Sequence, residues 1–76
     1  MNLQALLENG YIVAADDWLR MAVVWDGNST FNVYKNRDED VWVLEDVFVS
    51  ARINGHYSAK CQANSWIQFQ YDKLVD

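Results

Sequence analysis

The chain has 76 residues, of which 51% are hydrophobic and 14% aromatic, and its formal net charge at pH 7 is −5. A chain of this length supports one hydrophobic core, so residues 1–76 are expected to form a single domain. The negative charge argues against direct binding of nucleic acid or anionic lipid, because proteins that bind these polyanions normally present a basic patch.

The first expected element is a short helix over residues 2–9. Leu3, Leu6 and Leu7 recur at helical spacing, and Asn9-Gly10 supplies the left-handed residue that commonly ends a helix. The apolar run at 11–14 fits either a strand or an extended connection, and it is followed by the polar pair Asp16-Asp17.

Two strands are expected next, at residues 18–25 and 30–35, joined by a hairpin. The first segment is apolar apart from Arg20, and the second alternates between apolar and polar residues. The connection Asp26-Gly27-Asn28-Ser29 is rich in residues that tolerate a positive φ angle, as tight turns require. A third strand is predicted at 41–44 from its β-branched and aromatic content.

Residues 45–53 fit two interpretations. Their β-branched residues favour a strand, and Asn54-Gly55 then predicts a hairpin to a return strand over 57–63 and a final strand over 66–71. Alternatively, residues 45–54 form a second helix, with Glu45-Asp46 in its first turn and Gly55 beyond its end.

The expected fold class is therefore α+β. A short N-terminal helix should pack on a twisted antiparallel sheet of about five strands, with closure toward a small barrel as one option and the helix at 45–54 as the alternative.

Acidic residues are concentrated in the first part of the chain, since residues 1–46 contain nine of the eleven. In an antiparallel hairpin, the loop before the first strand and the loop after the second lie at the same end. Asp16-Asp17 and Asp38-Glu39-Asp40 should therefore form one acidic rim, partly offset by Lys35 and Arg37. Such a rim fits a solvated face, a surface for a basic protein, or a calcium site without the EF-hand pattern.

Aromatic residues next to these carboxylates are candidate anchors for a partner. An exposed Trp beside a charged surround is typical of a binding hot spot. The expected partner-binding residues are Asp16, Asp17, Asp38, Glu39, Asp40, Trp18 and Trp42.

Catalysis and cofactor binding are not expected. His56 and Cys61 are the sole residues of their types, and five positions apart on a strand they would face opposite sides, which favours a packed cysteine and a turn-proximal histidine. Neither a zinc-ligand set nor a phosphate-binding loop is present, so we expect no metal and no cofactor. A single cysteine, together with the lack of a signal peptide or long apolar run, predicts a soluble protein of the cytoplasm that does not bind a membrane.

The small size, the two carboxylate clusters and the missing catalytic groups resemble the small acidic inhibitors of phages and mobile elements, including anti-CRISPR and DNA-mimic proteins. The resemblance is one of class and matches no family motif. It implies a non-enzymatic inhibitor that acts in the host cytoplasm and blocks a basic, nucleic-acid-binding site on a host defence or nucleic-acid-processing protein. The alternative is a small structural or adaptor module that self-associates as a homodimer through an apolar sheet face or edge.

Overall fold

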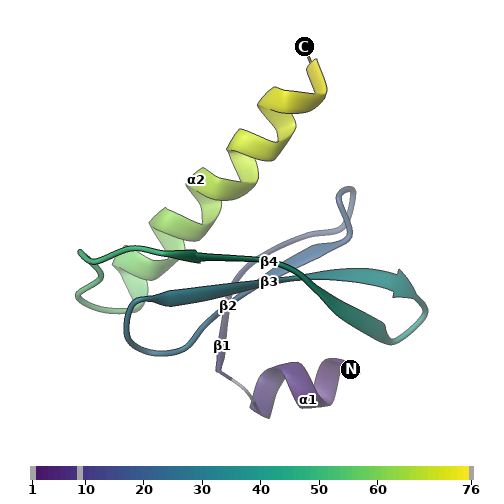
Figure 1. The fold of residues 1–76 in the computed structure, drawn as a ribbon, viewed down its shortest axis with the longest axis horizontal. Helices are drawn as coiled ribbons and strands as arrows, with labels where there is room; N and C mark the ends of the chain where they lie inside the picture. Colours follow the sequence, from purple (N-terminus) through teal and green to yellow (C-terminus); the bar gives the residue numbers. More distant parts are fainter. Residues whose placement is uncertain (1, 9, 76) are drawn as a thin grey trace.

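A computed structural model describes residues 2–8 and 10–75 of the chain and shows an open antiparallel sheet with one helix on each side (Figure 1). The four strands follow each other in the order β1-β2-β3-β4, so each is paired with its neighbour in sequence. In chain order the elements are α1 (Leu3–Glu8), β1 (Tyr11–Asp16), β2 (Met21–Trp25), β3 (Thr30–Asp38), β4 (Val41–Val49) and α2 (His56–Val75).

The structure confirms a short N-terminal helix and the central hairpin, whereas Asn9, at the expected end of the helix, lies outside the described residues. Turn residue Asp26 accepts hydrogen bonds at Oδ1 from the backbone amides of Asn28 (2.8 Å) and Thr30 (3.2 Å). Gly27 has a φ angle of 90°, which an L side chain rarely adopts. The β2 strand begins at Met21 rather than at Trp18, because residues 17–20 form the turn between β1 and β2.

Hydrophobic residues pack on both faces of the sheet, because neighbouring side chains of a strand point to opposite faces. The face that carries α2 holds the larger cluster, in which the buried residues are Val13, Ala14, Val23, Trp25, Phe31, Val33, Ala59, Ala63 and Ile67. On the other face Leu6 of α1 is fully buried against Val24 and Tyr34, with Ile12 and Trp42 at the margin. Each helix therefore depends on the sheet for its apolar contacts.

The last third of the chain differs from the expectation. Residues 45–49 continue strand β4, so the strand interpretation is confirmed there and the helix at 45–54 is wrong. The hairpin at Asn54-Gly55 and the strands at 57–63 and 66–71 are also wrong, since residues 56–75 form α2. The sheet therefore has four strands instead of five, and it is open rather than barrel-like.

Helical spacing explains why α2 forms there. Ala59, Ala63 and Ile67 lie four positions apart, which places them on one face of a helix, and all three are buried against the sheet. The Gly55 carbonyl accepts the first helical hydrogen bond from the Ala59 amide (3.0 Å), and Gly55 has a φ angle of 151°. The glycine thus serves the entry into a helix rather than a tight hairpin.

Candidate functional site

Two connections meet at one end of the sheet, as the sequence predicts. Met21 and Lys35 are opposite each other in the β2–β3 register, and the Asn36 amide donates to the Arg20 carbonyl (2.7 Å). This contact joins the β1–β2 connection to the strand that leads into the β3–β4 turn. We call the carboxylates of this end the acidic rim: Asp16, Asp17, Asp38, Glu39 and Asp40.

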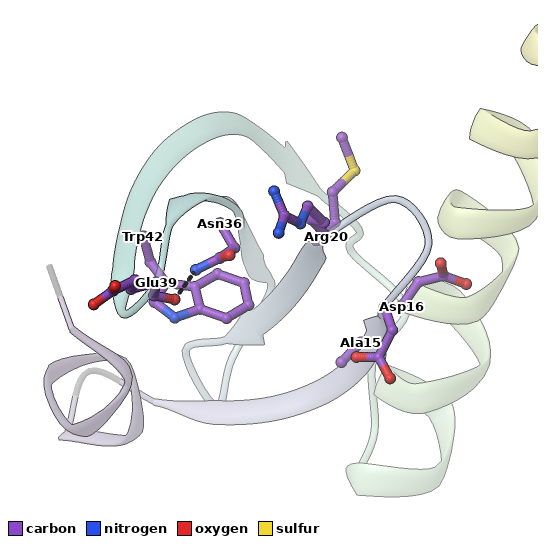
Figure 2. A pocket seen from close by; sticks show the side chains of 8 residues that line it. Ala15, Asp16, Arg20, Asn36, Glu39 and Trp42 are labelled. Carbon is purple, nitrogen blue, oxygen red and sulfur yellow. Dashed lines mark hydrogen bonds between the residues drawn. The ribbon is translucent and has the colours of Figure 1, made fainter.

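A shallow, open pocket of about 180 Å³ lies between the two connections (Figure 2). The pocket brings together three rim carboxylates, one tryptophan and one arginine, whereas Asp38, Asp40 and Trp18 are not part of its lining. Its lining residues are Ala15, Asp16, Asp17, Arg20, Met21, Asn36, Glu39 and Trp42.

Asp16 is held in place by two hydrogen bonds, one from its own turn and one from α2. Its Oδ1 accepts from the Leu19 amide (2.9 Å) and from the Tyr71 hydroxyl of α2 (2.6 Å). The Tyr71 bond and then the Leu19 bond lower the pKa of the Asp16 carboxyl below its ordinary value of 3.8, and the same contact raises the pKa of Tyr71 to about 12. Asp16 is therefore ionised at neutral pH and ties the rim to α2.

The β3–β4 turn holds the other cluster toward solvent. The Asn36 side-chain amide donates to the carbonyls of Glu39 (2.7 Å) and Val41 (3.3 Å), which orders the turn from within. Glu39 adopts a φ angle of 35°, in the left-handed region that a tight turn requires. Asp38, Glu39 and Asp40 are all exposed as a result.

The basic residues near the rim are arranged differently from the expectation. Arg37 forms an ion pair with Glu45 of β4 (2.7 Å), so its charge is directed to that carboxylate. Arg20, which the sequence analysis assigned to a strand, lies in the pocket instead, with a φ angle of 57°. Arg20 is the one charged residue in the apolar segment 18–25. It lies in the turn before β2, which begins at the next residue, Met21. Tyr71 had no comparable signal, because it lies 55 positions from Asp16.

The two predicted tryptophans occupy different positions. Trp18 is 82% exposed in the β1–β2 connection, directly after Asp17, while its neighbour Leu19 packs against the core. Trp42 is half-buried, with its ring forming one wall of the pocket beside Glu39 and Asn36 (Figure 2). The exposed indole of Trp18 and the pocket-lining indole of Trp42 therefore lie at the same end of the sheet.

His56 and Cys61 lie away from this pocket, at the start of α2 and one turn further along it. The His56 ring packs edge-on against Tyr11 and Trp25, with ring centroids 4.7 and 5.1 Å apart. Cys61 is exposed, so the expectation of a packed cysteine is wrong; the expected opposite-face strand geometry of the pair is replaced by a helix.

Within 2–8 and 10–75, no group of three or more His, Cys, Asp or Glu side chains is arranged to hold a metal ion. Neither helix in that part of the chain has the length and apolar character needed to cross a bilayer.

Comparison of the chain with models of protein families, with curated proteins and with solved structures gave no match.

Proposed function

We propose that the protein is a non-enzymatic binding module that uses the acidic rim, with Trp18 and Trp42, to occupy a basic nucleic-acid-binding surface of another protein. The observation that carries the proposal is the pocket that acidic residues of two separate connections line together with Trp42. Inhibition of a host defence or nucleic-acid-processing protein, as by anti-CRISPR or DNA-mimic proteins, is the corresponding biological role.

The size of the pocket favours a partner side chain over a small-molecule substrate. Ligand pockets usually enclose about 300–1,000 Å³, whereas this one measures about 180 Å³ and is open. Its lining sets three carboxylates against the single guanidinium of Arg20. A lysine or arginine of the partner would pack on the indole face of Trp42 and be attracted by the acidic residues around the pocket, which combines a cation–π contact with charge attraction.

The exposed part of the rim provides long-range attraction for the same partner. Asp17, Asp38, Glu39 and Asp40 are all exposed, so their field acts mainly on the rate of encounter and on the choice of partner. Trp18 adds an exposed aromatic surface of the kind that dominates binding hot spots. Binding of this type weakens as salt rises, because exposed charges are screened over about 10 Å at 0.1 M ionic strength.

The test begins with proteins retained from a native lysate on the immobilised chain at low salt and released at high salt. A retained nucleic-acid-binding protein is then purified, and its affinity is measured by calorimetry with and without its own nucleic acid. We expect the nucleic acid to compete with this protein, because both would occupy the same basic surface.

A pair of charge-matched variants assigns the surface. Asp17→Lys with Glu39→Lys alters the rim and spares Asp16, whose bond to Tyr71 supports the fold. Glu8→Lys with Asp72→Lys makes the same change in net charge on the two helices. The rim variant should lose at least about tenfold in affinity while the helix variant changes little. Equal affinity of the two variants, or binding that nucleic acid leaves unchanged, would refute the proposal.

A further inference from the structure

Strand β4 is an outer strand of the sheet and has an apolar surface. Among the described residues it pairs with β3 alone, along its whole length from Val41 to Val49. Long, apolar outer strands are templates for pairing with another chain, so natural proteins usually cover or interrupt them.

The apolar residues of β4 form a stripe on the face that carries α1. The register places Leu44 opposite Tyr34, which packs with Leu6 of α1, and places Val47 and Val49 opposite Asn32 and Thr30. Glu45 is the extra residue of a β-bulge between Leu44 and Asp46. The side chains of Leu44, Val47 and Val49 therefore follow one another along the α1 face. Leu44, Val47 and Val49 are 51%, 47% and 67% exposed.

The middle of β4 is acidic on the other face. Glu45 is paired with Arg37, whereas Asp46 is exposed and its Oδ1 accepts from the neighbouring Val47 amide (2.8 Å). Asp46 is opposite Val33, a core residue beneath α2, so it lies on the α2 face. The edge therefore combines an apolar stripe on one face with a carboxylate at the centre of the other.

This charge disfavours a second copy of the chain as the occupant. In a two-fold pairing of β4 with itself that overlaps most of the strand, the two Asp46 side chains lie opposite each other or about two positions apart. Like charges at such positions are destabilising, and Arg37 is already engaged with Glu45. A partner strand with a lysine or arginine opposite Asp46 would instead gain a favourable charge interaction.

We propose that β4 accepts an extended segment of a partner protein as a fifth strand of the sheet. The segment alternates apolar residues, which cover Leu44 and Val47 on the α1 face, with a basic residue opposite Asp46 on the α2 face. Backbone hydrogen bonds supply affinity in this mode of binding, and the alternate side chains supply selectivity. This edge is distinct from the acidic rim, so each proposal can fail without the other.

The probe is a short, end-blocked peptide of alternating valine and lysine, titrated into the full chain labelled with ¹⁵N. We expect chemical-shift changes and slowed amide exchange in β4, and binding about two- to fivefold tighter than that of the peptide with glutamate in place of lysine. The same lysine peptide methylated at alternate backbone nitrogens is the second control. It should bind more weakly, because methylation removes the donors of the new ladder.

Charge reversal then locates the contact. Asp46→Lys should reverse the preference between the lysine and glutamate peptides, whereas the matched variant Asp72→Lys on α2 should keep the wild-type preference. Circular dichroism checks that both variants fold, and the peptide comparison on the wild-type chain stands without them. The proposal would be overturned by chemical-shift changes confined to other elements or by equal binding of the methylated peptide. It would also be overturned by an unchanged peptide preference in Asp46→Lys, or by dimerisation of the chain through β4, seen as a dimer in sedimentation.

Discussion

Replacement of Phe48 by alanine tests how α2 is held on the sheet. Phe48 of β4 lies between two other rings, parallel to Phe31 at a centroid distance of 4.8 Å and to Trp66 of α2 at 5.7 Å. Each aromatic pair contributes about 0.5–1.5 kcal/mol beyond its burial. Loss of the half-buried ring adds about 1 kcal/mol, since complete burial of a Phe is worth about 1.5–3 kcal/mol.

The free energy of unfolding should therefore fall by about 2–4 kcal/mol in Phe48→Ala, out of about 4–11 kcal/mol for a domain of this length. Urea denaturation followed by far-UV circular dichroism measures it without relying on tryptophan fluorescence. Leu74→Ala, at a position 64% exposed near the end of α2, is the control and should change stability by less than about 0.5 kcal/mol.

A double-mutant cycle with Trp66→Ala isolates the contact between β4 and α2. The coupling energy between Phe48 and Trp66 should be about 0.5–1.5 kcal/mol. A loss below about 1 kcal/mol in Phe48→Ala, or additive effects in the cycle, would show that the stacked rings do not join the helix to the sheet.

Two further predictions concern close contacts in the fold. A Cβ at Gly10 would lie 2.5 Å from the Trp25 carbonyl oxygen, so Gly10→Ala should lower the free energy of unfolding by about 1–3 kcal/mol; an unchanged urea midpoint would contradict this. Tyr71→Phe should lower the melting temperature at neutral pH by removing the bond to Asp16. The folded state lowers the pKa of Asp16, so this stabilisation is present above the ordinary value of 3.8 and is lost as pH falls through the folded pKa. Thermal melts of both proteins should converge in acid, and a difference independent of pH would refute the assignment.

The short N-terminal helix, the hairpin between residues 21 and 35 and the strand that begins at Val41 were predictable because their signals are local. Turn residues such as Asp26 and Gly27 between two apolar segments indicate a hairpin. The alternation of apolar and polar residues in 30–35 indicates a strand. Hairpin geometry then places Asp16-Asp17 near the β3–β4 turn without knowledge of the rest of the fold, and the pocket confirms this convergence for Asp16, Asp17 and Glu39.

The C-terminal segment was not predictable in the same way, because its pattern satisfies two periods at once. Ala59 and Ala63 match both the alternation of a strand and the four-residue spacing of a helix. The choice depends on which surface is available to bury them, and the sheet formed by residues 11–49 presents an apolar face large enough for a helix that includes Ile67. Asp16 likewise gains its strongest partner, Tyr71, when α2 docks across that face. Local chemistry therefore accounts for the central hairpin and the convergence of the acidic rim, whereas contacts between residues distant in sequence account for helix α2 and the lowered pKa of Asp16. Because residues 56–75 form that helix instead of further strands, β4 is left as an outer strand of the sheet.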